Sequence, residues 1–391
     1  MIKSNFKKET RVYHCTLTPL TPIHIGSGNE LTPYEYIIKD KTFYRISLGS
    51  LLSKLSEKDK KELIRLLETT NFTTARKFLQ EIYKPEYGYY YSSHVDDDVI
   101  EIYDKKLDGA PKSNEENKLS VEEFIGNYLG KYIPGSSIKG AIRSAYLGSN
   151  MTSSHYYKIE RDVDKNTMPF LIDKNNIRKA KEESDKREAT IIGLREKKPF
   201  YDPFKKILIK DSEYLRNLVE VRAVERVNKK QNMPLGSYEV TKSILSTGDI
   251  IEINFEMDIV DIKSTTLPIK EVLNRINKNP IVDEYKTFII DKEKEGGLFY
   301  CLNEKAIKVL EEDKEFFSKV KNKEGIEACE EIEKYIEKLN SNEVLIKFGK
   351  GADFNSTTLN VFNNEIQKVY TRTTVSGLPC GWAILSYKEK R

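Results

Sequence analysis

Short stretches in which apolar and polar side chains alternate place the strongest constraint on how this chain folds. Residues 12–18, 219–227 and 249–257 alternate with a period of two, which predicts strands with one buried and one exposed face. Apolar residues recur at helical spacing over about 50–83 and about 303–340. Strands this short and alternating favour an α+β chain over a doubly wound parallel sheet.

Further strand-like runs join these into two clusters, each with helices between its strands. They are residues 34–38 and 43–46, which look like a hairpin, and residues 206–210, 344–348 and 381–387. We therefore expect two tandem sheet-plus-helix modules. The expected divisions are an N-terminal module over 1–173 with a helical insertion at about 50–83, an exposed basic linker over 174–204, and a C-terminal module over 205–391 with a helical insertion at about 303–340, where Gly325 is a candidate break.

Charge is unevenly distributed along the chain although its total is small. The 391 residues carry a net charge of +4, so any anion binding must come from local charge and not from bulk attraction. Residues 86–123 hold eleven acidic residues and four lysines, whereas 174–230 hold seventeen basic and ten acidic residues. We expect an acidic, partner-facing loop in the first segment and an exposed linker or mobile helix at Lys179–Arg187 in the second.

The cysteines and the N-terminus indicate the compartment. The four cysteines are far apart and form no CxxC pair, so neither a zinc knuckle nor a disulfide framework is expected. The basic N-terminus is not followed by an apolar run, and no run of about 18 apolar residues occurs. We expect a cytoplasmic protein that is neither exported nor inserted into a membrane.

The segment 132–148 carries the most informative motif. A Pro-Gly pair predicts a turn, and Ser136 or Ser137 is a suitable N-cap for an amphipathic helix. Lys139 and Arg143 stand four residues apart near the start of that helix, where free backbone N–H groups and the helix dipole favour an anion. A phosphate could bind there; ordinary solvated charges explain the pair equally well.

Two glycine-bearing loops each follow an apolar stretch, namely Gly26-Ser27-Gly28 and Gly349-Lys350-Gly351. Neither matches a nucleotide-binding fingerprint, and ordinary turns are the more frequent explanation of such loops. Glycine nevertheless lets a backbone approach a ribose-phosphate chain closely, and Lys347 and Lys350 add positive charge beside the second loop.

A search for catalytic residues finds little. The four histidines show no HExxH or i,i+4 pairing, and no G-x-S-x-G motif is present. His24 alone lies in a glycine-flanked loop, where it could contact a nucleotide or serve the loop structurally. The run Asp96-Asp97-Asp98 is better explained as a solvated acidic loop than as a metal site. No metal or cofactor is expected.

Several of these patches together resemble a known family. Residues 19–28 (PLTPIHIGSG), 133–143 (IPGSSIKGAIR) and 348–351 (FGKG), followed by Gly381-Trp382, resemble the RAMP superfamily of CRISPR proteins. Their order and spacing are most similar to the family of the fifth Csm subunit of type III-A effector complexes. The resemblance implies two ferredoxin-like (RRM-like) modules with helical insertions. It also implies an antiviral role in which the protein caps the filament of backbone subunits at the 3′ end of the crRNA and takes part in crRNA maturation.

The resemblance also implies the partners and the binding residues. The expected partners are crRNA, the backbone RAMP subunit, the small subunit and host trimming nucleases. The residues that match the family's RNA-binding patches are His24, Gly26, Ser27, Gly28, Ser136, Ser137, Lys139, Arg143, Lys347, Gly349, Lys350 and Gly351.

One departure from the family pattern bears on catalysis. The related backbone subunit cleaves target RNA with an aspartate in the loop after its first-strand glycines, but here that stretch is 30–33 (ELTP), without an aspartate. We therefore expect a non-catalytic RNA-binding subunit. Two alternatives stay open: a metal-independent endoribonuclease with His24 as its general base, and a hub whose acidic 86–123 segment recruits a separate trimming nuclease.

Overall fold

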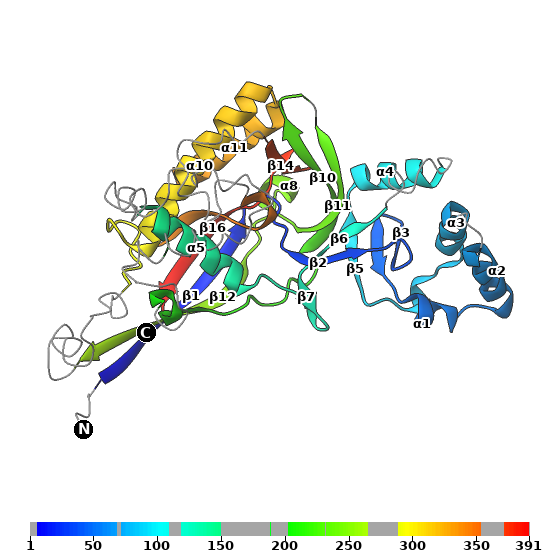
Figure 1. The fold of residues 1–391 in the computed structure, drawn as a ribbon, viewed down its shortest axis with the longest axis horizontal. Coiled ribbons are helices and arrows are strands. Elements are labelled where there is room, and N and C mark those ends of the chain that lie inside the picture. The colour runs from blue at the N-terminus through cyan, green and yellow to red at the C-terminus, as the bar shows by residue number, and fades with distance from the viewer. Residues whose placement is uncertain are drawn as a thin grey trace, which may run out of the picture.

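Two large β-sheets and a group of helices make up the described part of the molecule (Figure 1). The computed structural model describes residues 6–68, 72–108, 119–149, 188, 202–230, 232–264, 288–352 and 371–390. Within these residues, no helix has both the length and the apolar content needed to cross a membrane. The mixture of sheets and helices confirms the predicted α+β class.

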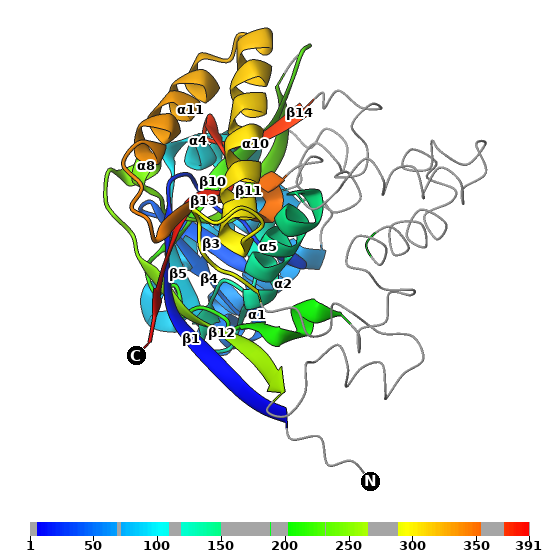
Figure 2. The same ribbon diagram turned by 90° about the vertical axis from the view of Figure 1, so that its left-hand side faces the viewer.

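The first sheet, sheet A, has five antiparallel strands with the first strand of the chain at its centre. Its order is β13 (Glu343–Lys347), β16 (Trp382–Glu389), β1 (Phe6–Pro19), β12 (Ile253–Ser264) and β9 (Ile207–Ile209). One face packs under α5 (Gly135–Ser149) and α10 (Leu298–Val320), as Figures 1 and 2 show. Alternation places Tyr13, Cys15 and Leu17 of β1 in this core, which the period-two pattern predicts.

The second sheet, sheet B, is mixed. Its order is β2 (Gly26–Leu31), β6 (Val121–Phe124), β11 (Met233–Thr241), β10 (Val219–Asn228), β5 (Tyr91–Val95), β4 (Thr42–Arg45) and β3 (Tyr36–Lys39), with β14 (Thr371–Val375) and β15 (Leu378–Pro379) attached through β10. The pairs β10–β5 and β11–β6 are parallel. A separate small hairpin, β7 (Gly126–Asn127) with β8 (Gly130–Lys131), projects beside it. The predicted hairpin at 34–46 is confirmed as β3–β4.

The predicted helical insertion near 50–83 is present. It comprises α1 (Leu48–Leu52), α2 (Glu57–Glu68) and α3 (Phe72–Ile82), followed by the short 3₁₀ helix η1 (Pro85–Tyr87). These helices share a core with the β3–β4 hairpin that includes Ile37, Ile46, Leu51, Leu63 and Leu79. They form the end of the molecule farthest from α10 in Figure 1.

The long helical stretch near 303–340 is divided into α10 and α11 (Lys323–Ile336). The break comes before the predicted Gly325, at Lys321, which adopts a positive φ of 57°, and Asn322, whose side chain caps α11. Gly325 lies inside the first turn of α11, where a Cβ would collide with the ring of Phe317. Glycine is therefore needed there for helix packing and not for the break.

The prediction of an acidic loop over 86–123 is wrong for much of that segment. Residues 91–95 form β5, and α4 (Asp97–Asp108) follows it directly. Asp96 caps α4 through the N–H of Asp97 and pairs with Arg222 over 2.9 Å. The three aspartates thus lie at the start of a helix, where the positive end of the helix dipole stabilises acidic side chains. Residues 109–118 lie outside the described part.

Both large sheets combine strands from before residue 132 with strands from beyond residue 200. Three short helices complete the described elements: η4 (Pro203–Lys206), α8 (Ile244–Thr247) and η6 (Gly349–Ala352). The predicted linker over 174–204, including Lys179–Arg187, falls outside the described residues apart from Glu188 and residues 202–204. The tandem-module division and its boundaries therefore stay predictions.

Candidate functional site

The two glycine-bearing segments predicted from the sequence lie against each other. The main-chain N–H of Lys350 donates to the carbonyl oxygen of His24 over 2.9 Å, and the N–H of Gly381 donates to Pro22 over 2.9 Å. Gly349 has a φ of 77°, and a Cβ at this position would lie 2.6 Å from the His24 carbonyl oxygen. Glycine at 349 is thus required both by its backbone conformation and by the close approach of the first segment.

The side chain of His24 lies in the interior. It is 1% exposed, its Nδ1 lies 2.7 Å from the carbonyl oxygen of Glu239, and its ring makes edge contacts with Phe124 and Tyr238. Burial lowers the pKa of His24 to about 4, an effect that Lys350 and Lys131 reinforce. The neutral, enclosed ring serves the loop structurally, which is the second of the two explanations given for it above.

The first glycine segment continues as an edge strand. Gly26, Ser27 and Gly28 belong to β2 at the end of sheet B, with an irregular register against β6. Gly26 and Gly28 are exposed, whereas half-buried Ser27 donates its hydroxyl to Glu123 over 3.2 Å. The predicted loop is therefore the start of a strand whose glycines face solvent.

Helix α5 forms where the sequence predicts it, but its cap differs. The helix begins at Gly135, and the N–H of Gly135 donates to the carboxylate of Asp211 over 2.9 Å. Ser136 and Ser137 consequently lie within the first turn and not at the N-cap. The prediction of a serine cap is wrong because Asp211, remote in sequence, supplies the acceptor.

Lys139 and Arg143 point toward their own chain. Lys139 donates to the carbonyl oxygen of Ile207 over 2.7 Å, and burial lowers its pKa. Arg143 pairs with Glu188 and Asp202 at 2.9 and 2.8 Å and lies over the ring of Phe204. Neither side chain is an ordinary solvated charge, and both tie α5 to the 202–207 segment.

Lys347 lies in a buried ion cluster. Its Nζ pairs with Asp313 over 2.6 Å, Arg372 pairs with the other oxygen of Asp313 over 2.5 Å, and Lys347 also lies over the ring of Trp382. Exposed Lys350 lies 5.4 Å from the ring centre of Tyr238, and Gly351 is buried against Cys380. The cluster fixes β13 and β14 to α10 beneath the second glycine segment.

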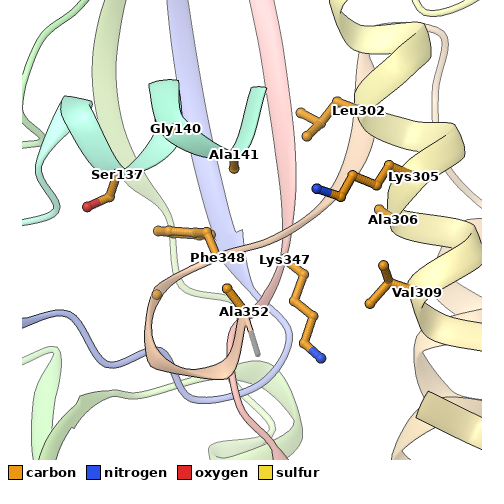
Figure 3. Close-up of a pocket in the computed structure, with 11 residues that line it drawn as sticks. Ser137, Gly140, Ala141, Leu302, Lys305, Ala306, Val309, Lys347, Phe348 and Ala352 are labelled. Carbon is orange, nitrogen blue, oxygen red and sulfur yellow. The ribbon is translucent and has the colours of Figure 1, made fainter. Parts of the chain in front are cut away.

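A pocket of about 190 Å³ opens between α5, α10 and the 347–352 turn (Figure 3). It joins two of the predicted motifs, since residues of α5 and of the second glycine segment both line it. The lining residues are Ser137, Gly140, Ala141, Leu302, Lys305, Ala306, Val309, Lys347, Phe348, Gly349 and Ala352. None of these lining residues carries a carboxylate, although Lys347 is paired with Asp313 and Glu312 acts electrostatically on Lys305.

Lys305 is a charged residue at this pocket that the sequence does not single out. It reaches from α10 toward α5, where its Nζ donates to the hydroxyl of Ser144 over 2.8 Å (Figure 3). Burial lowers the pKa of Lys305 to about 8. One sequence signal indicates that Lys305 is partly buried: it lies near Leu302 and Ala306 on a helix with apolar periodicity.

Comparison with known proteins identifies a family for this chain. The family model for the RAMP superfamily matches residues 16–352, a range that contains both glycine segments, α5 and the pocket. Three curated relatives carry the name "CRISPR system Cms protein Csm5". The protein from Methanocaldococcus jannaschii is 31% identical over 251 residues, 61% of this chain and 53% of that protein. The one from Streptococcus thermophilus is 28% identical over 63% of this chain and 68% of that protein.

The matched region thus spans about half the length of the M. jannaschii protein. Two solved structures share the fold, each at 19% sequence identity. The crystal structure of T. onnurineus Csm5 matches 94% of this chain and 99% of its own, with a TM-score of 0.60. A chain of the cryo-EM structure of a Csm–crRNA–target RNA ternary complex of a type III-A CRISPR–Cas system matches 96% of this chain with a TM-score of 0.54.

Proposed function

This chain belongs to the RAMP superfamily and is homologous to Csm5, and from this we propose that it is an RNA-binding subunit of a type III-A CRISPR effector complex. In that role it binds crRNA and contacts the backbone RAMP subunit and the small subunit. It caps the backbone filament at the crRNA 3′ end and supports crRNA maturation.

The observation that carries this proposal is the meeting of three sequence patches at one place. The 22–26 segment, the 348–352 turn and the start of α5 come from distant parts of the chain, yet the first two share the His24–Lys350 hydrogen bond and the last two line one pocket. Glycines let a ribose-phosphate chain approach the protein backbone closely, and neighbouring lysines attract its phosphates. Most hydrogen bonds between proteins and nucleic acids go to phosphate and sugar.

We assign the predicted residues two roles. Seven residues that are exposed or half-buried, and whose side chains are not used to fix α5 to the rest of the chain, contact the RNA: Gly26, Ser27, Gly28, Ser136, Ser137, Gly349 and Lys350. The others hold these in place: His24 and Gly351 through the packing of the two glycine segments, Lys139 and Arg143 through α5, and Lys347 through Asp313.

The subunit acts without cleaving RNA. Glu30 occupies the region where the related backbone subunit has its aspartate, and the buried ring of His24 cannot reach a substrate proton in this conformation. Incubation of the purified chain with labelled guide precursor tests this, and intact RNA is the expected result. Specific cleavage that His24→Ala abolishes would instead support the endoribonuclease alternative.

Assembly of the complex tests the main proposal. The full set of Csm subunits and a guide precursor are co-expressed with and without this chain, and the purified complexes are compared for composition and RNA length. We expect this chain to co-purify with guide RNA, and the 3′ end of the guide to change length when it is omitted. Complexes of unchanged composition and guide length would overturn the proposal.

A further inference from the structure

The pocket between α5 and α10 has the charge of an anion site. Lys305 carries one positive charge at its edge, and the cluster of Lys347, Arg372 and Asp313 adds two cations and one anion. The other lining residues are apolar or carry no charge, and none of the lining residues is acidic. A cationic group beside a partly water-excluded wall attracts an anion more strongly than one in bulk water does.

We propose that this pocket binds a phosphate group of an RNA chain and that Lys305 supplies the charge that holds it. This inference rests on the proposed function and assigns a ligand class to a site within it. Lys305 lies outside all of the patches that carry the family resemblance.

The shape of the pocket favours a compact group. Its volume of about 190 Å³ lies below the roughly 300–1,000 Å³ that pockets for drug-sized ligands occupy, so a phosphate fits better than a whole nucleotide. Gly140 adds no side chain to the α5 wall, and nothing lies within 4 Å of where its Cβ would be. That opening leaves room for a compact group against the α5 wall, opposite Lys305 of α10.

Lys305 is placed to serve such a group. Its ammonium has three N–H donors, and it bridges α10 to α5 through Ser144. Burial lowers its pKa to about 8 although the charge of Glu312 acts in the opposite direction, and a phosphate beside the ammonium would favour the charged form further. A bound anion therefore stabilises the charged form of Lys305 more than it would stabilise that of a fully solvated lysine.

The phosphate could be an internal phosphodiester or a 3′-terminal phosphate, and three RNAs distinguish them. Labelled single-stranded oligonucleotides of one sequence, ending in a 3′-hydroxyl, a 3′-phosphate or a 2′,3′-cyclic phosphate, are titrated with the full chain by fluorescence anisotropy. We expect Lys305→Gln to weaken binding about tenfold. A loss common to all three RNAs assigns an internal phosphodiester, and a loss confined to a phosphorylated end assigns a terminal one.

Two matched controls separate the site from general charge and from misfolding. Lys308→Gln removes an exposed lysine of the same helix and should change affinity far less. Gly140→Glu adds a carboxylate at the open wall, where a Cβ meets nothing within 4 Å, and it should weaken binding. Gly140→Gln, which has the same shape without the charge, should weaken binding less. Each variant is compared with the wild type by circular dichroism and thermal unfolding.

The outcomes divide cleanly between the two proposals. If the wild type binds RNA but Lys305→Gln and Gly140→Glu bind as tightly as it does, the pocket assignment is wrong and the proposed function stands. If the wild type binds none of the three RNAs, the proposed function fails and the pocket assignment falls with it.

Discussion

The main-chain N–H of Lys350 donates a hydrogen bond to the carbonyl oxygen of His24 over 2.9 Å. This contact holds the segment between β1 and β2 against the turn that follows β13. It also leaves the Lys350 side chain at the surface, above the ring of Tyr238. The segment that precedes Gly26 and the turn that contains Gly349 are thereby held side by side.

Gly349→Ala tests how strongly this contact depends on glycine. A Cβ at a φ of 77° and 2.6 Å from the His24 carbonyl oxygen forces the two segments apart, and the left-handed conformation alone costs about 1–2 kcal/mol. We expect a loss of at least about that much unfolding free energy in urea denaturation. Gly140→Ala is the control, since its site is open, and it should be neutral or stabilising by up to about 1 kcal/mol.

The acid sensitivity of the fold should depend on His24. Burial lowers its folded-state pKa to about 4 from an ordinary value of 6.5, so the unfolded chain binds more protons between these values. Stability is therefore fully present above about pH 6.5 and falls as the pH decreases toward 4, by at most about 3 kcal/mol from this group.

The measurement is the difference in unfolding free energy between the wild type and His24→Gln across this pH range. The difference should shrink as the pH falls. The matched variant His14→Gln, at a histidine whose side chain is 55% exposed, should leave the acid dependence of the wild type in place. A pH-independent difference for His24→Gln would contradict the buried, neutral ring.

Asp313→Asn should destabilise the protein strongly. Asp313 pairs with both Lys347 and Arg372 in the interior, and removal of its charge leaves two buried cations without their common carboxylate. Loss of one partner in such a cluster costs about 3–5 kcal/mol. Glu327→Gln, in an exposed pair with Lys323, is the control, and thermal and chemical unfolding should show a change below about 0.5 kcal/mol for it.

Arg143→Ala should act on stability before it acts on RNA binding. The guanidinium makes charge-assisted hydrogen bonds to Glu188 and Asp202 and lies over Phe204, contacts that together are worth about 2 kcal/mol or more. Arg143→Lys keeps the charge but loses the planar stacking, so it should lie between the wild type and alanine. Wild-type stability combined with lost guide RNA would show that Arg143 binds RNA directly.

The strands that the sequence predicts best are those with one buried face. β1 and β12 alternate because α5 and α10 cover one face of sheet A; the sequence of β10 alternates too, although both of its faces are buried at its start, where Glu220 is 1% exposed. β11 went unpredicted because its first half is largely exposed and its second half is buried throughout, which hides the period of two. Strand pairing was beyond prediction, since partners such as Cys15 and Phe255 are remote in sequence.

The elements that form the candidate site were predictable from the sequence, whereas the contacts of their side chains were not. Local signals placed α5 and both glycine segments, because turns and helix starts depend on neighbouring residues. The directions of Lys139 and Arg143 depend on Ile207, Glu188 and Asp202, which no local pattern connects to α5. Lys305 reaches the pocket solely through the packing of α10 on α5.

The central place of β1 in sheet A makes the order of synthesis matter. Its two neighbours, β12 and β16, emerge from the ribosome only after most of the chain or nearly all of it has been made. Until then both edges of the amphipathic strand β1 stay unpaired. Such long-range pairing slows folding, and unpaired strand edges make a nascent chain prone to aggregation. A chain with this topology has reason to depend on chaperones during its synthesis.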